Sequence, residues 1–486
     1  MTEALATPEG HRRRLLILGI LCTSLLIVSM DATIVNVALP VLRADLNASI
    51  TELQWTVDAY TLVLACFLML AGATGDRLGR KGTFQAGLAL FGTGSLLCSL
   101  APTVGWLIAA RVVQALGGAM LNPVAMSILT NVFTDPRERA RAIGVWGSVV
   151  GIALGVGPVL GGLLTGTVGW RAIFWVNVPV VLAAIVLVAR FVPGSRAARV
   201  RRADPGGQLL VVSLLGSVTG AVIEGPRLGW TSVWIITLAV VALASLTALL
   251  TWERRHPEPL VDLRFFASTP FSAATVIAIC GFAAFSSLLF LSGLYLQEVR
   301  GLSALQAGLT LLPAAVGATV CAPLSGRLVA SRGARLPLLV AGVAMTAVAL
   351  TFTGLGPATP PWLILVAHGV FGIAFGMMNP PITNTAVNGM PDDRAGVAAA
   401  VASTSRQTGQ TFGVAVAGTL VATAGGTLDG VTTAWTAVVV ATVTVAVLGV
   451  VATTARAHAS ARRVAELFAP GHHVPATHGP AARAGE

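Results

Sequence analysis

The sequence has little charge for its length. Only 10% of its 486 residues are charged, 55% are hydrophobic, and its mean hydropathy is +0.82. An ordinary soluble domain carries roughly 25% charged residues, and a single hydrophobic core stops growing at about 250–300 residues. These proportions exclude a soluble enzyme, a disordered chain and a disulfide-stapled secreted domain, and they leave lipid as the solvent.

Lysine is almost absent, and the few cysteines follow no binding pattern. Lys81 is the single lysine, and it follows Arg80. The Gly-Lys-Ser/Thr sequence of a phosphate-binding loop is therefore missing, which argues against transport driven by ATP bound to this chain. The five cysteines lie within or at the ends of apolar runs, without paired or metal-type spacing. We expect neither a disulfide framework nor a metal site.

Long apolar runs occupy most of the chain. Runs of about 20 residues, enough to cross ~30 Å of hydrocarbon, recur along almost its whole length. We place fourteen membrane spans, at 15–40, 53–73, 83–101, 105–130, 142–166, 172–192, 207–225, 232–252, 270–295, 305–326, 336–356, 361–383, 395–422 and 431–454. No small-residue cleavage site follows the first run, which therefore indicates a retained helix. The predicted fold class is an all-α polytopic membrane protein with 14 transmembrane helices.

The basic residues predict the orientation of these spans. If the N-terminus is cytoplasmic, 25 of the 31 basic residues lie on the cytoplasmic side. The other six are Arg43, Arg111, Arg171, Arg227, Arg300 and Arg406. An excess of arginine and lysine marks cytoplasmic loops, so both termini are predicted to be cytoplasmic. The net charge of +11 is then a topology signal, and we expect no nucleic-acid partner.

An internal repeat divides the chain into two halves. The loop after the second span reads Gly72-Ala-Thr-Gly-Asp76-Arg77-Leu-Gly79-Arg80-Lys81, and the loop after the tenth reads Gly326-Arg-Leu-Val-Ala330-Ser-Arg332-Gly333-Ala-Arg335. In both, two glycines are seven residues apart and a basic residue follows two positions later. Transporters built from two related halves show such repeats and bind substrate near the midplane between them.

This repeat predicts the domain organisation. The parts are an N-terminal cytoplasmic segment 1–14, a six-helix bundle 15–195, a linker 196–206, two extra helices 207–252, a second linker 253–269, a second six-helix bundle 270–455, and a cytoplasmic tail 456–486 that we expect to be disordered.

The loop after the second span resembles the G-x-x-x-D-R-x-G-R-K signature of the major facilitator superfamily. Its glycines permit a tight turn and close helix approach, and Asp76 can pair with basic groups on a neighbouring helix or loop. A loop that only directs topology requires neither feature. We interpret this loop as a gate at the cytoplasmic side, formed by Gly72, Asp76, Arg77, Gly79, Arg80 and Lys81.

Four further stretches resemble the fourteen-span drug:proton antiporters of that superfamily. They are 26–40 in the first span, 55–60 in the second, 111–118 in the fourth and 157–162 in the fifth. The fourth-span and fifth-span patterns depart at Ala115 and Ala153, where glycine is expected. The resemblance implies the major facilitator fold, with two six-helix bundles plus two extra helices.

The fifth-span stretch resembles the antiporter motif of that family. Proline removes one helical hydrogen bond and glycine admits close neighbours. The motif residues here are Gly157, Pro158, Gly161 and Gly162. A bend at this point could seal the inner route while the carrier faces outward.

Three ionisable residues lie at similar depth in the outer half of the first bundle. An ionised residue at the bilayer centre costs ~2.5–3.5 kcal/mol, yet Asp31, Asp58 and Arg111 are retained. At 1.5 Å per residue they can form one cluster. We predict that the arginine holds one aspartate ionised and that the second carboxylate, or the pair jointly, binds a proton. The alternative is a static ion pair that orders helix packing.

Polar residues elsewhere in the spans are candidates for a substrate cavity. They are Asn36, Tyr60 and Gln114 in the first half and Arg406, Gln407 and Gln410 in the second. Structural hydrogen bonds are the alternative for the second group.

The leading hypothesis is a proton-coupled antiporter that exports antibiotics or other amphiphilic or cationic compounds by alternating access. It would be a monomer in the lipid bilayer of a bacterial plasma membrane, with protons as coupling ions and no other cofactor. The alternatives are an uptake symporter, a membrane-bound enzyme and a non-transporting receptor or scaffold. The fifth-span motif argues against the symporter. The short, arginine-dominated loops argue against the enzyme.

Overall fold

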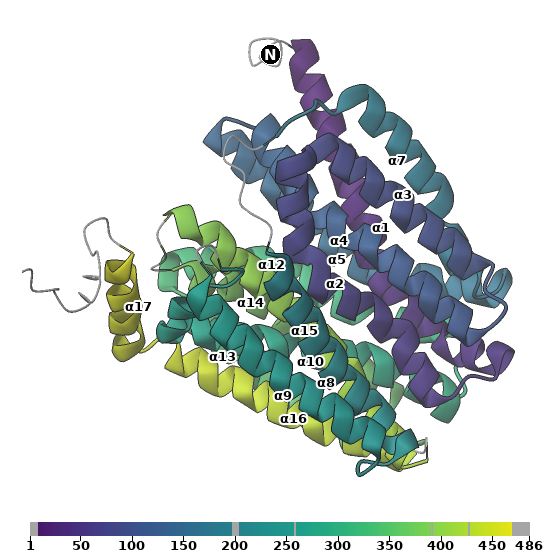
Figure 1. Ribbon diagram of the computed structural model, residues 1–486. Coiled ribbons are helices and arrows are strands. Elements are labelled where there is room, and N and C mark those ends of the chain that lie inside the picture. Colours follow the sequence, from purple (N-terminus) through teal and green to yellow (C-terminus); the bar gives the residue numbers. More distant parts are fainter. Residues whose placement is uncertain are drawn as a thin grey trace, which may run out of the picture.

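The computed structural model describes residues 8–196, 204–256, 259–388, 390, 392–425 and 428–468. Every regular element within these ranges is a helix (Figure 1). The helices form two bundles, with a helical hairpin between them in sequence.

The N-terminal bundle contains α1 to α7. Its helices are α1 (Pro8–Leu46), α2 (Ile50–Leu78), α3 (Arg80–Ser99), α4 (Val104–Val132), α5 (Pro136–Thr167), α6 (Ala172–Trp175) and α7 (Asn177–Phe191). Local sequence sets several of these boundaries. A capping box between Ser49 and Glu52 starts α2, and Asp135 caps α5. Gly79 separates α2 from α3 with a φ of +113°, a conformation that favours glycine.

The hairpin and the C-terminal bundle complete the fold. The hairpin is α8 (Pro205–Leu228) and α9 (Val233–Arg255). The C-terminal bundle contains a 3-10 helix η2 (Leu263–Ala267), α10 (Thr269–Leu294), a π-helix η3 (Tyr295–Val299), α11 (Ala304–Thr310), α12 (Leu312–Arg332), α13 (Arg335–Phe352), α14 (Pro361–Val387), α15 (Asp392–Thr423) and α16 (Leu428–Val451).

Helices occupy all fourteen predicted spans, which confirms the all-helical fold class. Within the described ranges, twelve helices are long and apolar enough to cross a membrane. The other two, α3 and α15, are rich in glycine, serine, threonine and glutamine, which lowers their hydropathy. The count of fourteen therefore stays a prediction. The first helix begins at Pro8, ahead of the predicted span start at residue 15.

The two bundles contact each other at the end of the molecule that contains the α1–α2 loop. We call this end the outer end, because the predicted orientation places it on the side opposite the cytoplasm. Arg43 Nη1 of α1 donates to both carboxylate oxygens of Glu298 at 2.9 Å. Gln297 donates to the Val37 carbonyl at 2.9 Å, and Gln54 of α2 donates to the Ala415 carbonyl of α15 at 2.8 Å. These contacts close the outer end around the axis between the bundles.

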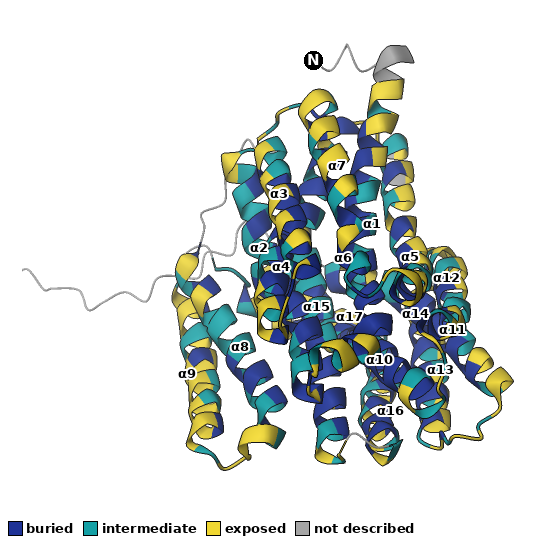
Figure 2. Cartoon of the chain, turned by 90° about the vertical axis from the view of Figure 1, so that its right-hand side faces the viewer, coloured by how far each residue is buried: buried dark blue, intermediate teal, exposed yellow. Residues whose placement is uncertain are grey.

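The α8–α9 hairpin packs along the contact between α2 and α15 (Figure 2). Trp55 of α2 donates to Glu224 of α8 at 2.8 Å, and Gln208 of α8 donates to the Cys66 carbonyl of α2 at 2.7 Å. Thr419 of α15 donates to the Val222 carbonyl at 2.8 Å. The hairpin thus contacts both bundles through α8, while much of α9 is exposed.

The tail expected to be disordered begins with a helix. Residues Ala455–Leu467 form α17, whose buried face contains Ala457, Ser460, Ala461 and Val464. The expectation of disorder therefore does not hold for this part of the tail. Its small apolar residues recur at helical spacing and pack against α10 and η2. Residues 469–486 lie outside the described ranges.

Candidate functional site

A buried ion pair lies inside the N-terminal bundle. Arg111 Nη1 of α4 donates a hydrogen bond to Asp31 Oδ2 of α1. The two side chains are 1% and 0% exposed, so protein groups replace their water. The arginine also donates to the Thr56 carbonyl at 3.1 Å and to Gln114 at 2.8 Å. The predicted association of Asp31 with Arg111 is therefore present in the structure.

A network of neutral side chains holds the second carboxylate oxygen of Asp31. Gln114 Nε2 donates to Asp31 Oδ1 at 2.8 Å and to Ser95 Oγ at 3.0 Å. Asn177 Nδ2 of α7 donates to the same two atoms, at 3.4 Å and 2.9 Å. The carboxylate is thus bound directly from α4 and α7, and Ser95 of α3 accepts a hydrogen bond from each of the two amides. Gly94 permits this arrangement, because a Cβ there would overlap the backbone of Gln114.

Aromatic rings cover the guanidinium of Arg111. Its Cζ atom lies 4.2 Å from the centroid of the Tyr60 ring and 5.8 Å from that of Phe174. A cation over an aromatic face is stabilised by the ring quadrupole, and more strongly where water is excluded. The Tyr60 hydroxyl donates to the Val28 carbonyl at 3.3 Å. In this conformation Tyr60 and Gln114, both predicted cavity residues, are sealed within the bundle.

Asp58 lies apart from the ion pair. The described residues give its side chain one hydrogen-bond partner, Thr61, whose Oγ1 lies 3.4 Å from Asp58 Oδ1. Asp58 Oδ2 is buried without a partner, and the residue is 0% exposed. Thr61 in turn accepts a hydrogen bond from Thr411 of α15 at 3.0 Å. The predicted three-residue cluster is therefore two sites, and Asp58 faces the contact with the C-terminal bundle.

The predicted cavity residues of α15 remain partly accessible. Arg406, Gln407 and Gln410 are half-buried. Arg406 donates to Thr383 of α14, and its Cζ lies 5.9 Å from the centroid of the Phe282 ring. By contrast, Asn36 of α1 is buried, with its amide donating to the Ala32 carbonyl at 3.0 Å and its Oδ1 unpartnered among the described residues.

Three phenylalanines pack together, and one of them, Phe282, lies beside Arg406. The Phe285 and Phe375 rings stack with centroids 4.4 Å apart, and Phe282 meets Phe375 at 5.1 Å. Such a group combines a flat apolar surface with a nearby cation. Among the six predicted cavity residues, the accessible ones therefore belong to the C-terminal bundle.

The gate loop forms a compact set of contacts within the N-terminal bundle. Arg80 Nε and Nη2 donate to Asp76 Oδ1 at 3.0 Å and 2.9 Å, across the turn at Gly79. Lys81 donates to the Ala189 carbonyl at the end of α7 at 2.7 Å. Arg77 is exposed, and Gly72 lies against Pro123 of α4. Asp76 thus pairs with the first residue of the neighbouring helix, as the sequence suggested it could.

The fifth-span glycines lie where α5 meets its two neighbours. A Cβ on Gly157 would overlap Thr33 of α1, and one on Gly161 would lie 2.8 Å from Ile34. A Cβ on Gly162 would lie 2.6 Å from Leu305 of α11. The Pro158 carbonyl lies against Gly308 of the same helix. This motif therefore lets α5 lie close to α1 of its own bundle and to α11 of the C-terminal bundle.

Sequence reasoning missed several members of the site. Ser95, Asn177, Thr61 and Thr411 contact the key carboxylates or their partners. Asn177 stands out in an apolar run from 172 to 189, and an isolated polar residue there is a functional candidate. A serine or threonine in a span does not indicate a functional site in this way, because its hydroxyl can donate a hydrogen bond to a carbonyl of its own helix.

Two helical bundles with buried charges between their helices are the architecture of membrane transporters built from two halves. The sequence model of the Major Facilitator Superfamily matches residues 21–414. The chain belongs to this superfamily of transporters, and it is not an enzyme.

Its relatives include drug resistance proteins. It is 37% identical to the Multidrug resistance protein Stp of Mycobacterium tuberculosis over 85% of this chain and 76% of that protein. It is 36% identical to the Methylenomycin A resistance protein of Streptomyces coelicolor over 85% of this chain and 87% of that protein. It is 35% identical to the Tetracenomycin C resistance and export protein of Streptomyces glaucescens, over 82% and 74%.

Solved structures share the fold at low sequence identity. The crystal structure of a D-xylose-proton symporter matches with a TM-score of 0.63 and 15% identity, over 90% of this chain and 97% of that chain. A bacterial homologue of the human lysosomal transporter Spinster, inward-facing and unoccupied, matches with a TM-score of 0.62 and 18% identity, over 94% and 98%.

Proposed function

We propose that this chain is a proton-coupled antiporter that exports antibiotics or other amphiphilic or cationic compounds by alternating access. It lies in a bacterial plasma membrane with fourteen spans and both termini in the cytoplasm. The observation that carries the proposal is a pair of fully buried carboxylates in different settings. Asp31 has a cationic partner, whereas the hydroxyl of Thr61 is the one partner that the described residues give Asp58.

The two settings suit different parts of a coupling cycle. A buried carboxylate without a cation is costly in its charged form, so Asp58 is suited to hold a proton in this conformation. Asp31 is charge-compensated by Arg111, and losing that partner would leave an unpaired charge. We therefore propose that Asp31 binds its proton when helix movement separates it from Arg111. One proton entering down 100 mV gains ~2.3 kcal/mol, which can drive export.

The closed outer end supports an inward-facing state. The Arg43–Glu298 and Gln54–Ala415 contacts join the bundles on the outer side. Arg406, Gln407 and Gln410 keep partial exposure in the same state. The proposed substrate site is therefore reached from the cytoplasm, and the gate loop around Asp76 would form its further contacts when the inner side closes.

Transport in inside-out vesicles tests the proposal. The vesicles are energised, ethidium is the probe, and a pH-sensitive dye follows the protons. Asp31→Asn and Asp58→Asn are each expected to abolish uncoupler-sensitive ethidium uptake into the vesicles and the accompanying proton release. Asp45→Asn is the control, because Asp45 lies at the outer end of α1, where it is half exposed and pairs with Arg171.

The same assay separates the alternatives. An antiporter moves ethidium into the vesicles as protons leave, whereas a symporter would move both in one direction. Wild-type uptake by either asparagine variant would exclude that aspartate as a coupling site. Absence of transport for ethidium and for a panel of antibiotics would favour the receptor or scaffold.

A further inference from the structure

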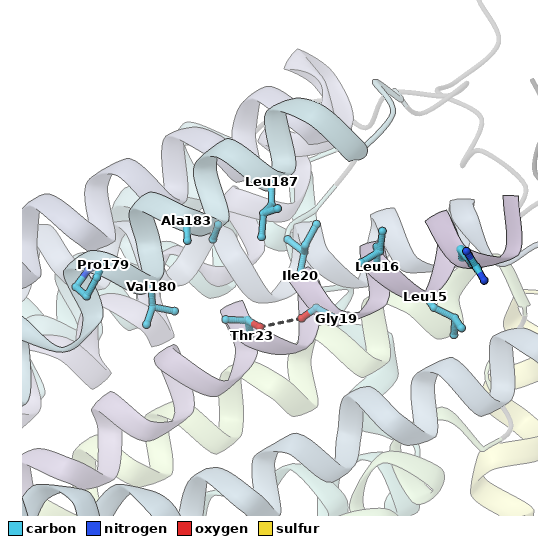
Figure 3. Close-up of a pocket in the computed structure, with 11 residues that line it drawn as sticks. Leu15, Leu16, Gly19, Ile20, Thr23, Pro179, Val180, Ala183 and Leu187 are labelled. Carbon is cyan, nitrogen blue, oxygen red and sulfur yellow. Dashed lines mark hydrogen bonds between the residues drawn. The ribbon is translucent and has the colours of Figure 1, made fainter. Parts of the chain in front are cut away.

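An apolar groove lies between α1 and α7 (Figure 3). Its volume is about 820 Å³, and all but two of its eleven lining residues are apolar or glycine. Gly19 forms part of the floor, and a Cβ there would meet nothing within 4 Å. The hydroxyl of Thr23 donates to the Gly19 carbonyl at 2.9 Å, so its polarity is satisfied within α1.

The groove is as long as one leaflet of a bilayer. On α1 it runs from Arg12 to Thr23, which at 1.5 Å per residue is about 16 Å. The hydrocarbon core of a bilayer is about 30 Å thick, so one leaflet is about half of that. Leu187 of α7 lies towards the Leu16 end of the groove and Pro179 towards the Thr23 end (Figure 3). The groove therefore follows the direction of a lipid chain.

The inner end of the groove is positively charged. Three arginines follow one another at the start of α1. Arg13 donates to the Phe191 carbonyl at 3.1 Å and Arg14 to Glu138 at 2.5 Å. Arg12 lines the groove, and the described residues give it no hydrogen-bond or ion-pair partner. Arg190, three residues after Leu187 on the same face of α7, is exposed.

We propose that this groove binds one anionic phospholipid of the inner leaflet. An acyl chain lies along α1 and α7, and the phosphate lies between Arg12 and Arg190. The guanidinium geometry suits phosphate, and the apolar lining of the groove suits an acyl chain. A second copy of the protein is a poorer occupant, because a two-fold interface would bring the same arginines together.

Native mass spectrometry of the purified, delipidated protein tests this site. Phosphatidylglycerol and phosphatidylcholine with identical acyl chains are the probes. Wild type is expected to bind one phosphatidylglycerol more tightly than any phosphatidylcholine. Gly19→Leu fills the floor and is expected to remove that tight binding. Gly166→Leu on α5 is the matched control, because it is also exposed with nothing within 4 Å of a Cβ.

The headgroup contacts are tested separately. One basic residue near an anionic headgroup gains ~1 kcal/mol, so Arg12→Gln and Arg190→Gln are each expected to weaken phosphatidylglycerol binding about fivefold. Arg335→Gln, an exposed arginine of the C-terminal bundle, is expected to leave it unchanged. Thermal unfolding confirms that each variant is folded.

Three results would overturn the proposal. Gly19→Leu could retain the tight lipid, the two lipids could bind equally, or Arg12→Gln could match Arg335→Gln. A dimer that Gly19→Leu dissociates would assign the groove to a second copy instead.

Discussion

The membrane-embedded arginines of the two bundles differ in their exposure and in their partners. In the N-terminal bundle Arg111 is sealed, ion-paired with Asp31 and covered by the Tyr60 ring. In the C-terminal bundle Arg406 is partly accessible, and its partners among the described residues are a threonine hydroxyl and the Phe282 ring. The sequence predicts that a repeat relates the halves, yet among the described residues the embedded arginine pairs with a carboxylate in the first half alone. The difference suggests that the first half handles protons and the second contacts substrate.

The largest expected effect comes from removing Arg111. Arg111→Gln leaves Asp31 buried without a cation, and breaking a buried pair in this way costs about 3–5 kcal/mol. Arg406→Gln leaves no carboxylate unpaired, so we expect it to lower the free energy of unfolding by about 1 kcal/mol at most. Thermal unfolding in detergent compares the two. The double variant Asp31→Asn/Arg111→Gln should recover much of the stability lost by Arg111→Gln, without recovering proton-coupled transport.

Equal losses of stability in Arg111→Gln and Arg406→Gln would contradict the proposed difference between the two bundles. They would mean that Arg406 also has a structural role, and the proposed division between the halves would fail.

A smaller effect is expected from the phenylalanines of the C-terminal bundle. Phe375→Ala removes a ring that stacks on Phe285 and contacts Phe282. We expect ethidium to stack against this aromatic group. One aromatic pair contributes about 0.5–1.5 kcal/mol, so the variant should bind ethidium roughly two- to tenfold more weakly. The ratio of protons to ethidium should stay at the wild-type value, because the carboxylates are unchanged. Phe375→Leu, which retains apolar volume, separates stacking from bulk. A changed proton ratio would contradict the division.

The ion pair could be predicted from sequence and the position of Asp58 could not. Charges are so costly in lipid that Asp31 and Arg111 at one depth indicate partners. The helical rise gives only that depth, whereas the direction of a side chain depends on the rotation of its helix. Asp58 shares the depth but faces Thr411 of the other bundle through Thr61. The helix α17 was missed because a short, basic, alanine-rich segment resembles a solvated tail until its packing partners are known.

The smallest expected effect concerns how Arg111 is held in the sealed bundle. Tyr60→Phe removes only the long hydrogen bond to the Val28 carbonyl and keeps the ring under the guanidinium. We expect a loss of stability below about 1 kcal/mol and unchanged coupling. Tyr60→Leu removes the ring face as well and should cost about 2 kcal/mol more, the contribution of a desolvated cation–π contact. Thermal unfolding and the vesicle assay measure both variants. If Tyr60→Phe alone abolished coupling, the Tyr60 hydroxyl would belong to the proton path. The role of Tyr60 would then extend beyond covering the Asp31–Arg111 ion pair.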